Sequence, residues 1–507
     1  MMKYVFAYIL LAFCCKGFAQ DTDPQPYAQS INSSGLKKHL LVLTSDSLEG
    51  RETATEGQRK AANYIEGVFK NAGLLPGWNG QYQQSFPVYQ STLNSATLNV
   101  NGVPLKMDTD YVVTPNSSFN VSFAASEVLF VGYGLSDSTR DDYKDVNARG
   151  KIVMVFPGAG YKIIKGKKVK DRIPDYLTLQ QAAQKNGAIA LLITDKRFPR
   201  KPTPGKSNMY VLDQSKEPLP NTFIISDSVG RKIMGNDYYI AQRIMKNNPP
   251  PPKSCYLSVT LSLDRSVERM ESSNVIAKIE GTDKKDEAVI ITSHYDHLGK
   301  TDSVIYHGAD DDGSGTATVL EMAQAFSKAT AAGLKPRRTL IFMTVSGEEK
   351  GLWGSSYYAE NPSFPLEKIS ANINIDMIGR IEDGRKEDSL NYIYVVGDDK
   401  LSSDLRPVSE AVNNKYSHSH LDYKFNDPND PMRIYYRSDH YNFAKNGVPA
   451  IFYFSGLHAD YHRPTDTEDK IRYDLLTKRA QLIFYTAWQI ANRDEMLKRD
   501  IPLPALH

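Results

Sequence analysis

Hydrophobic and polar positions follow a helical period near the start of the chain. Within residues 56–72 the apolar side chains recur every three or four positions and so fall on one helical face: Ala61, Ala62, Ile65, Val68, Phe69 and Ala72. Gly73 comes next, and a glycine at this point is typical of a helix end. The turn-rich segment 82–132 alternates apolar and polar residues, which predicts strands.

A strand–helix–strand unit is predicted in the middle of the chain. Residues 151–156 (KIVMVF) form an apolar run that ends in Pro-Gly, which is typical of a buried strand. A helical pattern over 177–186 and a second apolar run over 188–194 follow. Four consecutive prolines at 249–252 favour an extended connector and indicate a domain boundary.

Beyond the prolines, strands and helices alternate more regularly. The pattern predicts strands at 274–279, 288–292, 339–345, 372–377, 392–396 and 448–454, and helices at 314–328, 401–413, 440–446 and 473–492. This order predicts an α/β fold, with a mostly parallel (mixed) central sheet sandwiched by helices.

The composition is that of a folded chain with more than one domain. The chain has 507 residues, of which 41% are hydrophobic and 24% charged, so we expect two or three domains and no predominantly disordered state. Lys and Arg number 61 against 59 Asp and Glu, a net charge of +2, which argues against nucleic acid and anionic membranes as partners. Three cysteines are too few for a disulfide scaffold.

Residues 1–19 have the pattern of a secretory signal peptide. Lys3 precedes an apolar run over 5–13, and residues 17–19 (Gly-Phe-Ala) place small side chains where a signal peptidase cleaves. The run is too short to cross about 30 Å of hydrocarbon comfortably. A bulky residue before Cys14 disfavours a lipoprotein. We therefore expect an exported protein, periplasmic or secreted, with no stable membrane anchor.

Acidic residues and histidines gather directly after the predicted strands of the C-terminal half, in five segments: 293–297, 308–315, 346–349, 374–379 and 461–467. Sites in open α/β sheets form at the carboxyl ends of the strands. Singly, each segment has an ordinary explanation: the aspartates of 310–312 would cap a helix, and Glu348 with Glu349 would be a solvated pair. Asp376 is harder to explain, because a carboxylate in an apolar run is unfavourable when buried without a partner.

Together these side chains suit zinc or another borderline divalent ion, because the set contains carboxylates and imidazoles but no thiolate. Two histidines and three carboxylates can hold two ions with one carboxylate bridging them. Two ions about 3.5–4 Å apart activate a water molecule and polarise a carbonyl together. A further carboxylate must take the proton of that water, and the adjacent Glu348 and Glu349 offer one base and one ligand.

Six motifs as a set resemble the two-zinc aminopeptidase family, whose relatives include bacterial leucyl aminopeptidases, glutamate carboxypeptidase II and the transferrin receptor: SHYDHLG, GADDDGSG, SGEEKGLWGS, NIDMIG, RSDH and YHRPTDT. The segment DSLEGRETATEGQRKAANYI is similar to the N-terminal region of that family, and the stretch 142–153 is similar to a protease-associated (PA) domain. The resemblance implies a zinc-peptidase fold in residues 20–110 and 256–507, interrupted by a smaller, β-rich PA domain over 111–255.

The resemblance implies a role for each matching residue. Glu348 would be the general base. Five residues would hold two Zn²⁺ per chain: His294 and Asp376 at one ion, Glu349 and His462 at the other, and Asp311 between them.

Three more residues match supporting positions. Asp296 would hydrogen-bond the far nitrogen of His294 and fix its tautomer. Tyr461 matches a tyrosine that steadies the oxyanion in some relatives, with aromatic packing as the alternative. Arg437 matches an arginine that contacts substrate, with a structural salt bridge as the alternative. Four other histidines have no counterpart among the ligands and are interpreted as structural or surface residues: His297, His307, His440 and His458.

The resemblance implies an exported enzyme that acts on peptide substrates, and an aminopeptidase is the preferred interpretation. A carboxypeptidase or dipeptidase would use the same metals, with Arg433, Arg437 or Arg463 receiving a terminal carboxylate. Glutaminyl cyclisation is disfavoured, because cyclases of this fold work with one zinc ion and depart from GADDDGSG. A non-catalytic binding protein, as the transferrin receptor is, is disfavoured because all five candidate ligands and the base are present.

Overall fold

A computed structural model of the chain divides into two compact units. Unit 1 contains Met1–Phe86 and Ser272–His507, and unit 2 contains Pro87–Glu271. The predicted signal peptide, residues 1–19, lies outside the described residues. The structure describes 23–113, 120–138, 140–158, 161–164, 167–170, 173–202, 204–211, 218–245, 248–386 and 388–503, with the backbone alone for 161–164 and 167–170.

A mostly parallel sheet forms the centre of unit 1. Its strands follow the order β18-β17-β19-β16-β12-β15-β11. The pairs β17/β18, β16/β19, β12/β16 and β12/β15 are parallel, and β17/β19 and β11/β15 are antiparallel. The strands are β1 (Leu75–Pro76), β11 (Lys253–Ile279), β12 (Lys284–His294), β13 (Lys300–Thr301), β14 (Val304–Ile305), β15 (Arg338–Val345), β16 (Ile369–Ile375), β17 (Tyr392–Val396), β18 (His420–Asp422) and β19 (Ala450–Phe454). Each of the six strands predicted beyond the prolines is present.

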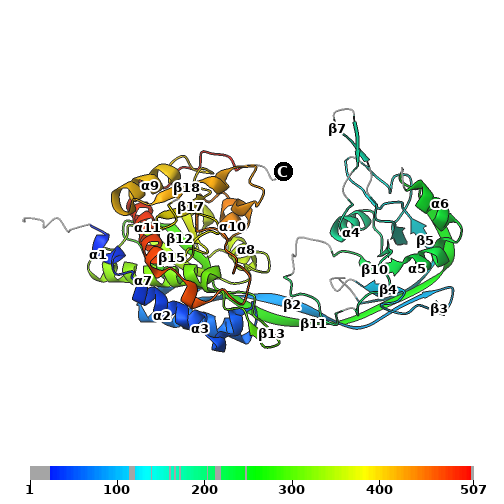
Figure 1. Cartoon of the computed structure of the whole chain (residues 1–507), viewed down its shortest axis with the longest axis horizontal. Helices are drawn as coiled ribbons and strands as arrows, with labels where there is room; N and C mark the ends of the chain where they lie inside the picture. The colour runs from blue at the N-terminus through cyan, green and yellow to red at the C-terminus, as the bar shows by residue number, and fades with distance from the viewer. Residues whose placement is uncertain are drawn as a thin grey trace, which may run out of the picture. The chain divides into compact units, whose positions relative to one another are not determined.

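Helices accompany this sheet along both its faces (Figure 1). They are α1 (Gln25–Ala28), α2 (Ser33–Leu43), α3 (Glu56–Asn71), α7 (Gly315–Ala331), α8 (Trp353–Glu360), α9 (Leu405–Val412), α10 (His440–Ala444) and α11 (Tyr473–Asn492). Single turns complete the unit: η1 (Asp46–Arg51), η2 (Ala309–Ser314), η3 (Leu366–Lys368), η4 (Asn413–Ser417), η5 (Lys424–Asn426), η6 (Ile434–Tyr436) and η7 (Glu468–Lys470). Among the described residues, no helix combines the length and the apolar character that a membrane span requires.

The alternation of side chains along β12 explains the two helical layers. Val289 and Ile291 pack in one cluster with side chains of α2, α3, α7 and α11. Ala288 and Ile290 point to the other face, where they pack with Tyr358 of α8 and Phe443 of α10. A strand buried on both faces reads as a continuous apolar run, as 288–292 does. The predicted mixed α/β fold is confirmed.

Unit 2 has the strand order β11-β5-β6-β9-β10-β4, in which β5, β6, β9 and β10 run parallel. The predicted strand–helix–strand unit is present as β6, α4 and β9. The elements are β2 (Gln83–Val100), β3 (Val103–Pro104), β4 (Tyr111–Val113), β5 (Val121–Phe130), β6 (Ile152–Val155), β7 (Tyr161–Ile164), β8 (Lys167–Lys170), α4 (Tyr176–Lys185), β9 (Ala190–Asp195), β10 (Asn221–Ser226), α5 (Asp227–Met234) and α6 (Asp237–Ile244).

The inserted unit is longer than the 111–255 expected from the sequence. It runs over Pro87–Glu271, because two long strands, β2 and β11, carry the chain out of unit 1 and back. Residues 253–263 of β11 pair with β5, whereas residues 275–279 pair with β15. The four prolines at 249–252 precede β11 within unit 2, so they do not mark the boundary.

Candidate metal centre

The predicted site residues come together at one edge of the unit 1 sheet. Because β12, β15, β16 and β19 run parallel to one another, their carboxyl ends share this edge. Six side chains gather there, and each lies within ion-pair distance of at least one other. They are His294 at the end of β12, Glu348 and Glu349 after β15, Asp376 after β16, His462 after β19, and Asp311 in η2, just before α7.

One half of the centre is built around His294. Its Nε2 lies 3.2 Å from Oδ1 of Asp311 and 3.6 Å from Oδ1 of Asp376. The other oxygen of Asp376 accepts a hydrogen bond of 2.7 Å from the Ser438 hydroxyl, which orients the carboxylate. All three residues are buried, and their donor atoms lie within 4.8 Å of one another. One cation can therefore contact all three.

The other half is built around His462. Its Nε2 lies 3.1 Å from Oδ2 of Asp311 and 3.0 Å from Oε2 of Glu349. Asp311 thus turns one carboxylate oxygen toward each half, as a bridging ligand must. The backbone of His462 has a φ of 57°, in the left-handed region that residues other than glycine seldom adopt. Such strain clusters at functional sites.

A third histidine belongs to this second half. His297 is fully buried, and its Nδ1 lies 2.8 Å from Oε1 of Glu349 and 3.8 Å from Oδ2 of Asp311. These three residues form a second group whose donor atoms lie within 4.8 Å of one another. The expectation that His297 could lie at the surface is therefore wrong, because the residue is buried beside Glu349. Its one sequence signal was its place in SHYDHLG, three residues after His294.

Several donor atoms in the second half are buried and have no hydrogen-bond partner among the described residues. Leaving a buried polar atom unpaired costs about 1–3 kcal/mol, so atoms that converge this closely need a shared partner. Imidazole and carboxylate donors without a thiolate suit zinc and similar borderline divalent ions. The residues present therefore fit such a cation. The unpaired atoms are His297 Nδ1 and Nε2, Asp311 Oδ2, Glu349 Oε1 and His462 Nε2.

The charges of the cluster act strongly on one another. Burial disfavours the charged form of Asp311, yet His294 and His462 hold its pKa well below the ordinary value. Burial lowers the pKa of His462, but Asp311 and Glu349 outweigh this and raise it to about 10. Burial likewise opposes the charged form of His294, whose pKa is nevertheless raised by Asp376 and Glu348. The carboxylates therefore draw positive charge to this edge, and a divalent cation competes with protons for the same atoms.

Glu348 lies beside the first half of the centre. Its Oε2 is 4.0 Å from Nε2 of His294. Burial raises the pKa of Glu348 well above the ordinary carboxyl value, His294 opposes this, and Glu349 and Asp376 add to it. A carboxylate with a raised pKa is suited to accept and return a proton near neutral pH.

Asp296 supports the site through other contacts than the one expected. The far ring nitrogen of His294, Nδ1, lies 3.1 Å from the backbone carbonyl of Asp296, whereas the carboxylate is 3.8 Å away. The carboxylate accepts hydrogen bonds from the Thr53 hydroxyl at 2.7 Å and from the backbone N–H of Glu348 at 3.3 Å. Because these two donors orient the Asp296 side chain, it is the carbonyl that faces His294.

The helix-capping alternative applies to Asp312 rather than to Asp311. The Oδ1 of Asp312 accepts from the backbone N–H groups of Gly315 at 2.9 Å and Met377 at 3.1 Å. This carboxylate therefore ties the first turn of α7 to the segment after β16. Asp311 is left to face the two histidines.

A pocket opens beside the centre. Tyr461 and Arg437 border it, and Nη2 of Arg437 donates a hydrogen bond of 3.2 Å to the Tyr461 hydroxyl. The Tyr461 ring also stacks on the His462 ring, with centroids 3.9 Å apart. Both interpretations of Tyr461 therefore remain open, because it packs and also presents a hydroxyl. The remaining lining is Asp311, Glu348, Asp376, Met377, Ile434, Ser438, Phe452, Phe454 and Leu457.

Three further histidines expected to be structural or surface residues lie outside both donor groups. Each has a different neighbour: His307 Nδ1 lies 2.8 Å from the Thr44 carbonyl, His440 stacks on Phe452, and His458 Nε2 lies 3.2 Å from Asp310.

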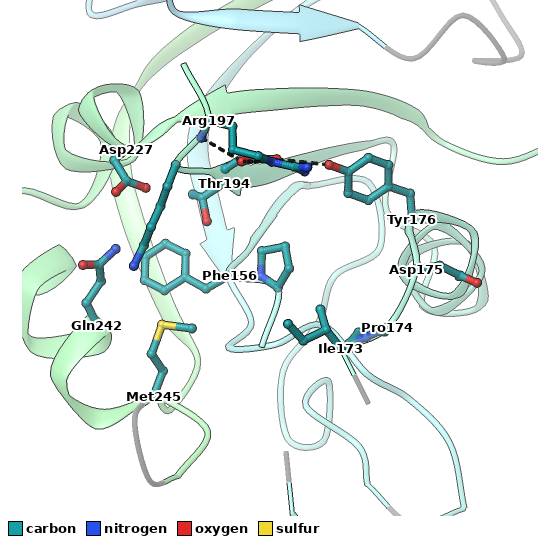
Figure 2. Close-up of a pocket in the computed structure, with 13 residues that line it drawn as sticks. Phe156, Ile173, Pro174, Asp175, Tyr176, Thr194, Arg197, Asp227, Gln242 and Met245 are labelled. Atoms are coloured by element: carbon teal, nitrogen blue, oxygen red, sulfur yellow. Dashed lines mark hydrogen bonds and ion pairs between the residues drawn. The ribbon is translucent and has the colours of Figure 1, made fainter. Parts of the chain in front are cut away.

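A separate cavity of about 590 Å³ lies within unit 2 (Figure 2). Residues that follow β6, β9 and β10 border it, including Phe156, Arg197 and Asp227. Two of its charged groups pair with each other: Arg197 contacts Asp195 at 2.7 Å, and the Tyr176 hydroxyl donates to the same carboxylate at 3.3 Å. Both candidate metal groups found among the described residues belong to unit 1.

Comparisons with known proteins agree with this geometry. A probable zinc metalloprotease of Pyrenophora tritici-repentis is 26% identical over 259 residues, which are 44% of this chain and 52% of the relative. Leucine aminopeptidase 1 of Penicillium rubens is 29% identical over 228 residues, 43% of this chain and 56% of the relative. The chain spans about half, or less, of the length of the curated relatives that it matches.

A solved structure extends the likeness to the whole fold. The aminopeptidase from Aneurinibacillus sp. strain AM-1 matches with a TM-score of 0.55 and 21% identity, over 95% of this chain and 100% of that chain. At this identity the likeness shows a shared fold. The match to the description "Peptidase family M28" covers residues 274–487, which hold every donor of both halves. The segment that holds the metal centre, residues 274–487, is therefore similar to peptidase family M28.

Proposed function

We propose that the chain is an exopeptidase with two zinc ions per chain, which removes N-terminal residues from peptides. One observation carries the proposal: two donor groups converge on the two oxygens of Asp311, with Glu348 beside them. A probable zinc metalloprotease and a leucine aminopeptidase among the relatives support this activity.

The side chains of the pocket have complementary tasks in this reaction. Bound zinc would supply Lewis acidity toward the scissile carbonyl and the attacking water. Glu348 would take a proton from that water and return it to the departing amine, a cycle that suits its raised pKa. Burial raises the pKa of Tyr461, so its hydroxyl stays protonated. That hydroxyl, which accepts from Arg437, would donate to the developing oxyanion.

The lining of the pocket favours a free amine next to an apolar side chain. A free α-amine would bind at one of the zinc ions or at a carboxylate that lines the pocket, Asp311, Glu348 or Asp376. An acetylated amine has no charge, and its nitrogen is a poor metal ligand. Five apolar side chains complete the lining and would pack against the first residue of the peptide: Met377, Ile434, Phe452, Phe454 and Leu457.

A matched substrate panel tests the proposal. Purified protein is stripped with a chelator, reloaded with zinc, and given aminoacyl-nitroanilides, the N-acetylated forms of the same compounds, and dipeptides. We expect zinc-dependent release from the free-amine nitroanilides, fastest with apolar side chains. Cleavage confined to blocked substrates or dipeptides would instead identify a carboxypeptidase or dipeptidase. A zinc-loaded protein that hydrolyses none of them would contradict a peptidase function.

We also propose that residues 1–19 direct export and that unit 2 is a protease-associated domain inserted into the peptidase fold. The short apolar run supports the first proposal. In the sequence, unit 2 interrupts unit 1, and this supports the proposal of an inserted domain. Sequencing the N-terminus of protein recovered from outside the cytoplasm tests export: we expect Gln20 as the first residue, and an intact Met1 would contradict it.

A further inference from the structure

We infer that His297 is a fourth protein ligand of the second cation, beside Asp311, Glu349 and His462. The inference rests on the proposed two-zinc centre and goes beyond it, because it makes the two halves unequal. The first half would have three protein ligands and the second half four.

His297 is buried close to both carboxylates of the second half. The residue has no exposed surface, and its Nδ1 approaches both carboxylates of the second half, at 2.8 Å from Glu349 and 3.8 Å from Asp311. The edges of a tetrahedral zinc site are about 3.3 Å when zinc–ligand bonds are about 2.0–2.1 Å long. The 3.0 and 3.1 Å contacts of His462 with the same carboxylates lie in the same range.

The contact between His297 and Glu349 is short, but it does not have the direction of a hydrogen bond. Among the described residues, neither ring nitrogen of His297 has a hydrogen-bond partner, and neither has Oε1 of Glu349. A buried imidazole that merely oriented Glu349 would aim an N–H group along this contact. Two unpaired atoms that lie side by side instead suit a common ion.

Another buried histidine of the same unit, His440, has different surroundings. His440 also has no exposed surface, but its ring lies against Tyr435 and Phe452, and no carboxylate of the described chain lies within ion-pair distance of it. Burial lowers the pKa of His440 to about 3, so it is a neutral packing residue. His297 differs because two carboxylates and a second imidazole surround it.

Two segments outside the SHYDHLG motif hold His297 in place. Its backbone N–H donates to the carbonyl of Arg51 at 3.3 Å. Gly308 lies against the ring, so that a Cβ at this position would approach Cγ of His297 to 2.5 Å. The rings of His297 and His462 lie with centroids 6.0 Å apart and planes at 68°. The two imidazoles therefore approach the second half from different directions.

Unequal ligand numbers have a chemical consequence. Sites with four protein ligands are closed, and sites with three keep a position open for water or substrate. We therefore expect the second half to bind zinc more tightly and to fill first. The open position then lies at the His294 half, within reach of Glu348.

Zinc binding to the full-length protein tests the inference without an activity assay. Wild type and variants are titrated with zinc chloride in chelator buffers, and the bound zinc is counted by elemental analysis. We expect wild type to bind two ions, and His297→Ala to bind the ion of the second half more than about 100-fold more weakly. Loss of a hydrogen-bonding partner of a ligand costs roughly 10–100-fold.

Two substitutions separate a ligand from a residue that only orients Glu349. His297→Cys keeps a zinc ligand, and we expect it to retain tight binding of both ions. His297→Asn keeps an N–H donor but is a poor zinc ligand, and we expect it to behave like His297→Ala. If His297→Asn bound both ions tightly and His297→Cys lost the second ion, the inference would be overturned. His440→Asn is the matched control, because it alters a buried histidine outside the centre, and it should keep both ions.

X-ray absorption at the zinc edge gives a second measurement that needs no variant. Wild type loaded with one equivalent of zinc should show two imidazole ligands, from His297 and His462. A single imidazole would overturn the inference, as would His297→Ala that binds both ions with wild-type affinity. A wild-type protein that binds no zinc would overturn the proposed function, and the inference with it.

Discussion

The Oδ2 atom of Asp311 lies 3.1 Å from Nε2 of His462, while Oδ1 of the same carboxylate lies 3.2 Å from Nε2 of His294. One side chain therefore faces both halves of the metal centre. Asp311 therefore couples the half built around His294, at the end of β12, to the half built around His462, after β19.

Replacing Asp311 with Asn should weaken both zinc sites at once. The amide has one oxygen and no charge, so it cannot serve two cations. We expect both zinc affinities to fall by at least roughly 10–100-fold, measured by titration in chelator buffers. Asp474→Asn is the matched control, since it makes the same chemical change at an exposed position of α11, where Asp474 pairs with Arg472 on the surface. Two tightly bound zinc ions in Asp311→Asn would refute the bridging role.

Replacing Glu348 with Gln should abolish most turnover and leave zinc binding intact. The amide keeps the shape of the side chain but cannot accept the proton of water. We expect kcat to fall by about 10²–10⁴-fold, with two zinc ions bound and an unchanged melting temperature. Glu360→Gln on α8 makes the same chemical change at an exposed position and should have wild-type kinetics. Near-normal hydrolysis by Glu348→Gln would exclude it as the base.

Replacing Tyr461 with Phe separates the hydroxyl from the ring. The ring stacks on His462, and the Phe ring can do the same, so we expect zinc binding to be retained. Losing one donor to the oxyanion should lower kcat by about 10²–10³-fold with little change in KM. If Tyr461→Phe instead keeps its kcat and only Tyr461→Ala loses activity, the residue acts by packing alone.

The layered fold of unit 1 could be predicted because its hydrophobic pattern matches the burial. The segment 473–492 predicted as a helix is α11, and the apolar run 288–292 lies within β12. The limits of the insert could not be predicted in the same way. Strand β11 continues through 27 residues, from alternating burial near 254–265 to full burial near 272–277, with an exposed stretch between. Local periodicity contains no signal for where such a strand changes units.

The candidate site was predictable for residues that belong to recognisable motifs and not for His297. His294 and His297 come from the same motif, and spacing alone does not say which imidazole meets a carboxylate. The placement of His297 depends on the backbone of Arg51, which is distant in sequence, and on the close approach of Gly308, which lies outside the motif. The contact of His294 with the carbonyl of Asp296, rather than its carboxylate, likewise depends on Thr53.

Replacing Arg51 with Ala should destabilise unit 1 strongly. The guanidinium is fully buried and donates to the carbonyls of Leu43, Tyr295, His307 and Gly308 at 2.6–3.0 Å. Its removal leaves these buried carbonyls without their donor, next to the segment that holds the metal ligands. We expect a loss of about 3–5 kcal/mol in the free energy of unfolding, measured with denaturant.

The control for Arg51 is an arginine from the next helix. Arg59 is exposed and pairs with Glu56 at 2.9 Å on the surface of α3. Exposed pairs of this kind contribute about 0–1 kcal/mol, so Arg59→Ala should unfold near the wild-type midpoint. Equal effects of the two substitutions would show that the carbonyl cluster around Arg51 does not stabilise the fold.

Replacing His440 with Phe should make the protein more resistant to acid. Burial lowers the pKa of His440 to about 3, whereas an unfolded histidine titrates near 6.5. The unfolded state therefore binds a proton that the folded state does not, and stability is lost as the pH falls from about 6.5 toward 3. At pH 5 the protonation of His440 in the unfolded state lowers the free energy of unfolding by about 2 kcal/mol. A Phe ring can keep the stacking on Phe452 and removes the titration.

The measurement is the free energy of unfolding of metal-stripped wild type and His440→Phe at pH 7 and pH 5. Stripping the metal removes the acid release of zinc from the comparison, and the titration of the metal ligands is common to both proteins. We expect the drop between the two pH values to be smaller in the variant by about 2 kcal/mol. Equal drops in the two proteins would mean that His440 is protonated in the folded state, and that its ring is not a neutral packing group.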